Sequence, residues 1–208
     1  IKVRAKDAVG NYSEYGVHVV EVDLDAPNIP NPNTLSPTNN KTPTWTWQEI
    51  ENAVEYEIIL DNQFIRFNLV GNEEFTSDEL SDGEHEIKIR ARDEVGNFSA
   101  YGTHVVKIDT IPPHVPQPSA NTPTRNTSIS WSWELIENAV DYEVLLNNEP
   151  QTLQTNSTFK ADNLSEGSHE IKVRAKDEVG NYSAYGSHVV VIDLTSPFKP
   201  SPITTTPT

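Results

Sequence analysis

Apolar and polar residues alternate with a period of two along most of this chain. In one segment the apolar residues Ile87, Ile89 and Ala91 are separated by basic ones. Such alternation is typical of a β-strand with one buried face, because successive side chains point to opposite sides. No segment carries apolar residues at helical spacing over enough length to form a helix. The pattern therefore predicts an all-β protein.

One stretch of 23 residues occurs three times. It occupies residues 1–23, 87–109 and 171–193, so that successive copies begin 86 and 84 residues apart. The second and third copies are identical at 18 of 23 positions, and so are the first and third. Self-similarity at a fixed period is the signature of a repeat protein. We therefore interpret the chain as one module that is repeated.

Each copy of this stretch predicts a β-hairpin. Gly10 and Asn11 tolerate positive φ and separate two alternating runs in the first copy, as their counterparts do in the others. In the return strand one register is apolar apart from a histidine, and we expect it to face the core. The residues of that register are His18, Val20 and Val22, then His104, Val106 and Ile108, then His188, Val190 and Ile192.

A Trp-x-Trp pair opens each complete module. Trp45 and Trp47 recur as Trp131 and Trp133. Side chains two positions apart in a strand lie on the same face, so both tryptophans of a pair are expected to point inward. We expect one to occupy the centre of the core and the other to lie at its rim.

The next run alternates apolar and polar residues and ends in a turn-forming dipeptide. It covers residues 54–60 and again 140–146, and it predicts a central strand with one buried face that begins at the valine. The segments 64–70 and 151–155 differ most between the modules, and there we expect short edge strands. About seven short strands per module predict an antiparallel β-sandwich.

Proline-rich segments join the modules, and linkers of this composition are stiff. We predict the C-terminal hairpin of a preceding module at residues 1–26, complete sandwich modules at 27–112 and 113–196, and the start of a following module at 197–208, like beads on a string. Further copies of the module in the same chain, or a neighbouring chain in a filament, would complete the two terminal fragments.

The chain is acidic, with 31 Asp and Glu against 15 Lys and Arg and a net charge of −16. Nucleic acids and anionic membranes need a cationic face, so we expect neither nucleic-acid binding nor direct membrane insertion. The absence of Cys excludes disulfides and thiolate metal sites. No nucleophile with catalytic partners and no phosphate loop stands out, and most histidines follow the repeat, so no enzymatic activity is predicted.

Two long runs of the module carry a resemblance to a known family. They are TWTWQEIENAVEYEIILD and SDGEHEIKIRARDEVGN. They resemble the fibronectin type III-like and bacterial immunoglobulin-like repeats of large, adhesin-type bacterial surface proteins. The resemblance implies an extracellular or cell-surface protein in which the modules form a spacer, a stalk or a filament segment. Where many such modules have a corner tyrosine, this chain has His85 and His169, which implies a hydrogen bond that depends on pH.

Acidic residues near the hairpin turns predict a candidate calcium site. In a sandwich of this type the hairpin turn and the loop after the tryptophan strand lie beside the preceding linker, and together they would supply the oxygen ligands that calcium prefers. Alternatively, Asp and Asn cap a tight turn by bonding to its backbone. No other cofactor is required. The candidate ligands are Asp23, Asp25, Asp93, Asn97, Asp109, Glu134, Glu137, Asp177 and Asn181.

Aromatic residues near the same turns form a second candidate site. Exposed aromatic rings repeated in each module would suit multivalent binding of a glycan or of a host or cell-surface protein. The alternative is that the rings pack over the end of the sandwich. A spacer should cover them, whereas a binding module should expose them. The residues are Tyr12, Tyr15, Phe98, Tyr101, Tyr182 and Tyr185.

Overall fold

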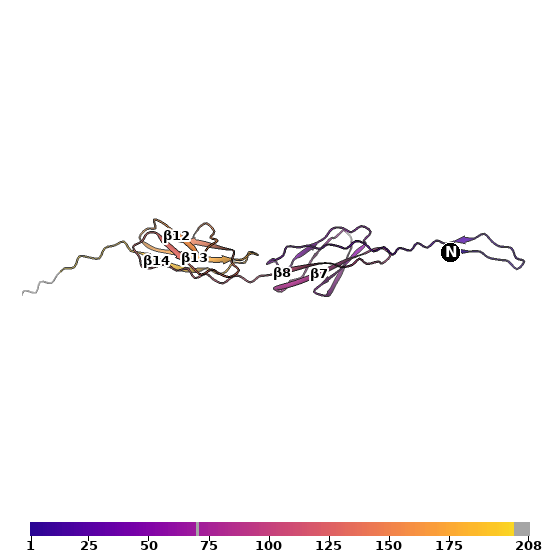
Figure 1. The fold of residues 1–208 in the computed structure, drawn as a ribbon, viewed down its shortest axis with the longest axis horizontal. Coiled ribbons are helices and arrows are strands. Elements are labelled where there is room, and N and C mark those ends of the chain that lie inside the picture. Colours follow the sequence, from indigo (N-terminus) through magenta and orange to yellow (C-terminus); the bar gives the residue numbers. More distant parts are fainter. Residues whose placement is uncertain (70, 202–208) are drawn as a thin grey trace, which may run out of the picture. The chain divides into compact units, whose positions relative to one another are not determined.

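The computed structural model describes residues 1–69 and 71–201, which form strands, turns and loops (Figure 1). The described residues contain no helix, and so none that could span a membrane, and the predicted all-β fold is confirmed. Val70, the end of an expected edge strand, and residues 202–208 lie outside the described residues. The chain divides into two compact units, Ile1–Ser36 with Thr42–Lys107 and Pro37–Lys41 with Ile108–Thr208.

Most strands of the first unit belong to two antiparallel sheets. The larger sheet has the order β5-β4-β7-β8, and β3 pairs with β6 in the smaller one. Near the N-terminus β1 (Lys2–Val3) pairs with β2 (Gly16–Val17). The remaining strands are β3 (Thr44–Thr46), β4 (Glu55–Leu60), β5 (Gln63–Leu69), β6 (Glu74–Thr76), β7 (Gly83–Arg92) and β8 (Gly102–Ile108).

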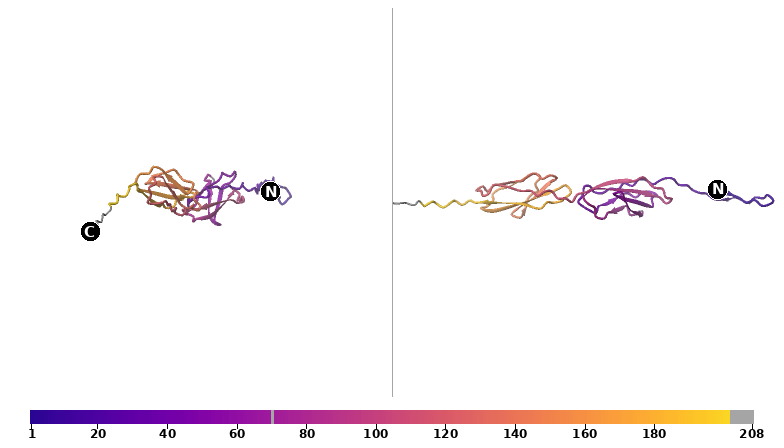
Figure 2. Two further views of the ribbon diagram at one scale, coloured as in Figure 1. Left: turned by 60° about the vertical axis from the view of Figure 1, so that its left-hand side comes forward. Right: turned by 90° about the horizontal axis from the view of Figure 1, so that it is seen from below.

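The second unit repeats this arrangement. Its larger sheet has the order β11-β10-β13-β14, and β12 pairs with β9. Figure 2 shows the strands of both units from two further directions. The strands are β9 (Ile129–Ser132), β10 (Asp141–Leu146), β11 (Glu149–Pro150), β12 (Thr158–Ala161), β13 (Gly167–Lys176) and β14 (Gly186–Ile192).

The core of the second unit lies between its two sheets and is centred on Trp131. This residue is fully buried, and Trp133 is 6% exposed. The ring of Trp131 lies 6.2 Å from that of Phe159, and Trp133 meets Tyr142 edge-on at 5.4 Å. Aromatic pairs at these distances add to the stabilisation that burial provides. The tryptophans of the first unit are buried to the same extents, which confirms the predicted central and peripheral positions.

The register predicted to face the core does so in β8 and β14 but not in the first copy of the hairpin. There the prediction is wrong, because Val20 and Val22 are 68% and 72% exposed. In the described structure β1 and β2 pair only with each other, and a lone two-stranded hairpin offers no second layer to pack against. The buried residues of this register are Val106, Ile108, Val190 and Ile192.

Two further strand predictions need correction. No strand forms at 151–155, a segment that is fully described: β11 ends at Pro150, which has no N–H for a ladder, and Gln154 makes an isolated bridge to Tyr142. Val54 and Val140, expected on the buried face, are 38% and 48% exposed; they precede β4 and β10, although their backbone N–H groups still bond to Arg92 and Lys176 on the adjacent strands.

The proline-rich segment before each tryptophan strand takes the place of the seventh strand. In the second unit it makes isolated bridges, Ser119 with Ser132 and Thr124 with Ile192, and no continuous ladder. Proline lacks the N–H that a ladder requires. Since Ser132 belongs to β9 and Ile192 to β14, the segment contacts both sheets of its unit.

A glycine at the start of β14 allows the proline-rich segment to cross in direct contact with the strand backbone. A Cβ atom at Gly186 would lie 1.7 Å from the carbonyl oxygen of Pro116 and 3.3 Å from the ring of Pro118. Gly102 has the same relation to the carbonyl oxygen of Pro30, also at 1.7 Å. No side chain fits at either position. Glycine is therefore required at these two positions by the close approach of two backbones.

Replacing Gly186 with alanine should destabilise the second unit, because the added methyl group displaces the backbone of Pro116. Overpacking of this kind costs about 1–3 kcal/mol. Urea unfolding followed by tryptophan fluorescence measures the change. Gly16→Ala is the matched control, because a Cβ atom there meets no atom closer than 3.6 Å. Equal effects of the two substitutions would contradict the packing argument.

Candidate functional site

The hairpin turn after β7 is bonded to the linker that precedes the unit. Asp93 Oδ1 accepts the backbone N–H groups of Gly96 at 2.7 Å and Asn97 at 2.8 Å, and its Oδ2 accepts the side-chain amide of Asn97 at 2.8 Å. The same amide donates to the backbone oxygens of Asp23 at 3.3 Å and Asp25 at 3.4 Å. The capped turn thereby connects the hairpin to the linker.

The turn after β13 repeats this geometry. Asp177 Oδ1 accepts the backbone N–H of Asn181 at 2.8 Å, and its Oδ2 accepts the side-chain amide of Asn181 at 2.9 Å. That amide also donates to the backbone oxygen of Asp109, in the linker, at 2.9 Å. Turn and linker are 72 residues apart in sequence and yet lie side by side in the folded unit.

The candidate calcium ligands of the turns and linkers contact N–H groups. The carboxylates of Asp93 and Asp177 accept hydrogen bonds from their own turns, as in the capping alternative. Burial raises the pKa of Asp93, but the hydrogen bonds from Asn97 outweigh burial and hold this pKa below the usual 3.8. Among the described residues, no group of three or more His, Cys, Asp or Glu side chains is placed to hold a metal ion. Calcium binding stays a prediction.

If the turn carboxylates only cap their turns, calcium should leave the melting temperature of the chain unchanged, because these carboxylates already receive N–H donors. Calorimetric melts in calcium and then in excess chelator measure this, since any ion that binds only the folded state raises the melting temperature. A rise in calcium would instead favour the predicted site. That rise should then disappear in the Asp109→Asn variant.

The candidate ligand-binding aromatics pack around an arginine on the outer face of the four-stranded sheet. Arg90 Cζ lies 4.0 Å from the ring centre of Phe98 and 4.8 Å from that of Tyr101. Its Nη2 lies 2.8 Å from Glu57 Oε2, and the Tyr101 hydroxyl donates to Oε1 of the same glutamate. The second unit repeats these contacts with Arg174, Tyr182, Tyr185 and Glu143.

The aromatic rings are neither fully buried nor fully open. Tyr12 and Tyr15 are half exposed and lie near Arg4, and the four rings of the later copies are partly covered. A guanidinium against a ring is a favourable cation–π contact. A sugar that stacks on such a ring would have to use the face that the arginine leaves free. Ligand binding by these aromatic residues stays a prediction.

Glu57 and Glu143 belong to this network although the alternating pattern places them on the solvent face of a strand. Glu57 is only 8% exposed. Burial raises its pKa, but the hydrogen bonds from Arg90 and Tyr101 outweigh burial, and the pKa falls below the usual 4.5. The signal in the sequence is a glutamate in both modules at the position that pairs with an arginine on the adjacent strand.

Replacing both glutamates with glutamine should lower stability at neutral pH and weaken its dependence on acid. A depressed carboxyl pKa contributes stability that is present above the unfolded-state value and lost as pH falls through the folded-state value. A hydrogen bond to a charged group contributes about 1.5–3 kcal/mol. Urea unfolding at several pH values below neutrality measures the change, with Glu94→Gln in an exposed turn as control. An unchanged acid dependence would contradict the assignment.

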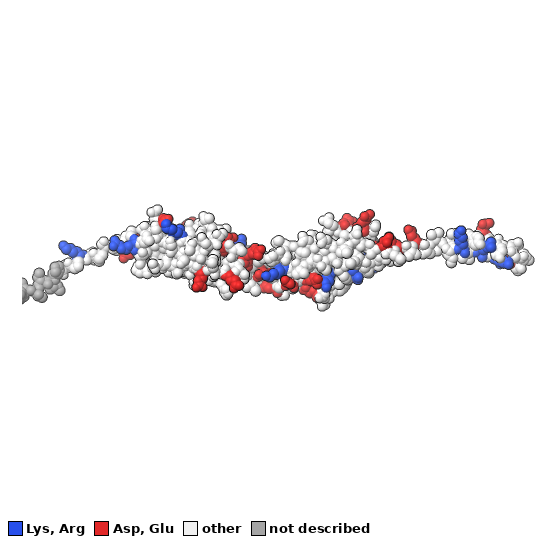
Figure 3. Space-filling model, in the orientation of Figure 1, with Lys and Arg blue, Asp and Glu red and all other residues white. Residues whose placement is uncertain are grey.

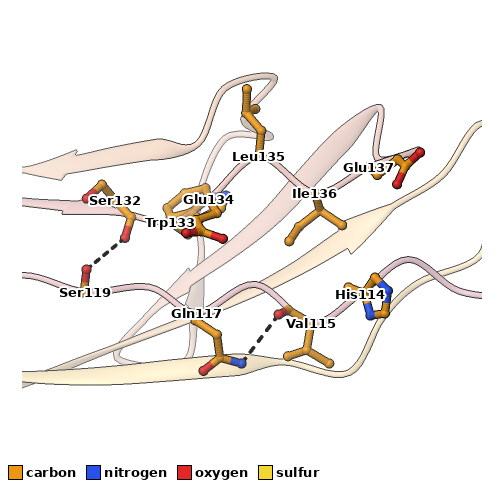
Figure 4. Close-up of a pocket in the computed structure, with 10 residues that line it drawn as sticks. All are labelled: His114, Val115, Gln117, Ser119, Ser132, Trp133, Glu134, Leu135, Ile136 and Glu137. Carbon is orange, nitrogen blue, oxygen red and sulfur yellow. Dashed lines mark hydrogen bonds between the residues drawn. The ribbon is translucent and has the colours of Figure 1, made fainter.

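A groove of about 690 Å³ opens between the proline-rich segment and the loop after β9 (Figure 4). The Ser119 hydroxyl donates to the backbone oxygen of Ser132 at 3.4 Å, and the two segments diverge beyond this contact. The candidate calcium ligands Glu134 and Glu137 line this groove together with His114. The groove therefore combines apolar and acidic side chains.

The comparisons with known proteins concern the fold. Residues 32–110 match the model of the bacterial Ig-like domain family, which confirms the predicted immunoglobulin-like module for this segment. Fibronectin(III)-like modules of CbhA from Clostridium thermocellum align at 14% identity over 82% of this chain and 100% of theirs, with a TM-score of 0.49. Domains FN1–FN3 of chicken CNTN1 align at 19% identity over 92% and 74%, with a TM-score of 0.48. The comparison with curated proteins gives no match.

Proposed function

We propose that this chain is a structural spacer, stalk or filament segment of a bacterial cell-surface or secreted repeat protein. The observation that supports this most directly is that the proline-rich linkers before the two units are bonded into them. In the second unit the amide of Asn181 binds the backbone of Asp109. Further along, Gly186 leaves space for the backbone of Pro116.

A linker held at several points resists bending for a physical reason. Proline fixes φ near −65°, and a hydrogen bond to the linker backbone removes rotational freedom that a Gly/Ser-rich linker would keep. The first unit makes the same contacts through Asn97 and Gly102. Because the contacting residues recur with the module, a longer array would repeat these contacts at every linker.

The charge of the chain supports a spacer that stays soluble beside other copies of itself. Asp and Glu side chains lie over both units, with fewer Lys and Arg among them (Figure 3). Like charges repel, and a net charge of −16 opposes close self-association. The partners we propose are further copies of the module in the same chain. Neighbouring chains in a filament would need contacts strong enough to overcome this repulsion.

The match of residues 32–110 to the bacterial Ig-like domain family supports two parts of this proposal, the cell-surface or secreted location and the lack of enzymatic activity. Bacterial Ig-like domains commonly occur in surface or extracellular proteins, and such families are generally non-catalytic. The buried carboxylate of Glu57 is bonded across strands to Arg90 and Tyr101. We propose an extracellular or cell-surface protein without enzymatic activity.

The alternative function is a module that binds a glycan or a protein. The groove of Figure 4 and the partly exposed tyrosines favour it. The arginine that lies against the rings of Tyr182 and Tyr185 favours the spacer, because it already occupies part of the aromatic surface.

Small-angle X-ray scattering of the Asn97→Ala/Asn181→Ala variant tests the spacer function. Loss of both amides should release the linkers, so that the scattering profile shifts toward that of a flexible chain. Asn11→Ala is the matched control, because the amide of Asn11 bonds to Asp7 within its own turn. Identical profiles for the wild-type chain and the double variant would contradict the proposed role of the linker contacts. Glycan binding that is lost in Tyr101→Ala and Tyr185→Ala would favour the alternative.

A further inference from the structure

A histidine bonded on both sides of its ring closes one corner of the first unit. The side chain of His85, on β7, is 11% exposed. Its Nδ1 lies 2.6 Å from Asp61 Oδ2, and its Nε2 lies 2.9 Å from the backbone oxygen of Ser81. Asp61 Oδ1 accepts the backbone N–H of Glu86 at 2.9 Å. This second bond holds the carboxylate toward the ring.

Both partners of the His85 ring are hydrogen-bond acceptors. A backbone carbonyl has no hydrogen to donate, and neither has an ionised carboxylate. The two bonds therefore form together only when both ring nitrogens carry hydrogen, as in the charged imidazolium. A neutral His85 would leave one acceptor facing a nitrogen lone pair, and an unmade bond at a mostly buried site is costly.

The second unit has the same corner with a different partner. His169 Nε2 lies 2.9 Å from the backbone oxygen of Ser165, and its Nδ1 lies 3.0 Å from Asn147 Nδ2. Asn147 Oδ1 accepts the backbone N–H of Glu170 at 3.0 Å, so the amide nitrogen must face the ring. One partner donates and the other accepts, which matches a neutral imidazole.

We propose that the corner of the first unit is a proton-binding switch, which stabilises this unit while His85 is charged. The corner of the second unit lacks the switch, because Asn147 stands where the first unit has Asp61. Both residues occupy the first position of the two-residue turn and share a positive φ, 50° for Asp61 and 52° for Asn147. The turn therefore has the same left-handed conformation at this position, and the Asp61 carboxylate is the second acceptor that makes the first corner sensitive to protons.

Other charged groups lie on the elements next to His85, and most of them are acidic. Burial lowers the pKa of His85, but the bonds to Asp61 and Ser81 outweigh burial, and the pKa rises above the usual 6.5. Nearby carboxylates favour the same charged form. The titratable groups on the surrounding elements are Asp61 in the turn, Asp78, Glu79 and Asp82 in the loop that holds Ser81, Glu84 and Glu86 on β7, and His104 and Lys107 on β8.

The direction of the pH effect follows from proton linkage. A histidine whose pKa is raised by folding contributes stability that is fully present below its unfolded-state pKa and lost as pH rises through its folded-state pKa. The first unit should therefore weaken as pH rises above the usual value of about 6.5. The stability that ionised Glu57 contributes is lost in a separate pH range, because this loss begins only as pH falls below about 4.5.

Reciprocal substitutions test the switch in the intact chain. Asp61→Asn gives the first unit the corner of the second, and Asn147→Asp gives the second unit the corner of the first. Amide NMR signals follow the thermal unfolding of the two units separately at about pH 6 and about pH 9. We expect the wild-type first unit to melt at a lower temperature at the higher pH. Asp61→Asn should remove this fall, and Asn147→Asp should introduce it into the second unit.

A direct titration of the His85 ring by NMR gives a second measurement that does not depend on unfolding. We expect a midpoint above 6.5 in the wild-type chain and a lower midpoint in Asp61→Asn. The same midpoint in both proteins would overturn the proposal, and so would a pH dependence of the first unit that survives Asp61→Asn. Neither result bears on the spacer function, which the scattering experiment tests.

Discussion

The pairing of β4 with β7, and of β10 with β13, is the interaction on which each unit depends. In the first unit its register sets Ile58 opposite Ile89 on the buried face and Glu57 opposite Arg90 on the outer face. A slip by one residue would exchange the two faces and carry a charged side chain into the core. The packed core and the outer network of glutamate, arginine and aromatic rings therefore favour the same register independently.

The hairpin built on this central pair also makes the linker part of the unit. The turn after β7 carries Asn97, whose amide reaches the linker backbone, and the return strand β8 begins with Gly102, where the backbone of Pro30 crosses. In each unit one stretch of 23 residues thus supplies a central strand, an edge strand, core residues and linker contacts. These combined demands explain why the stretch is so alike in the two units, whereas the opposite edge of each sheet, at β5 and β11, varies more.

The edge strands β5 and β11 are protected against pairing with another chain in two different ways. An edge strand presents unpaired backbone groups that invite pairing with another chain. In the first unit β5 has a register shift opposite Ile58 and Ile59, and Arg66 turns inward over the ring of Phe75 at 5.3 Å. In the second unit Pro150 ends the edge strand after two residues. Both a bulge with an inward charge and a proline discourage strand addition.

The sequence by itself determined the all-β class, the repeat, the tryptophan core and the corner histidines, because alternation and turn-forming residues act over a few neighbouring positions. The sequence also identified the candidate residues of the hairpin turns, but it did not show to which groups their side chains form hydrogen bonds. The tertiary structure alone decided that Glu57 is covered by Arg90 and Tyr101, which lie 33 and 44 residues away. It likewise decided that the amide of Asn97 meets a linker carbonyl 72 residues away. Such contacts form only once the strands have paired, so no local pattern records them.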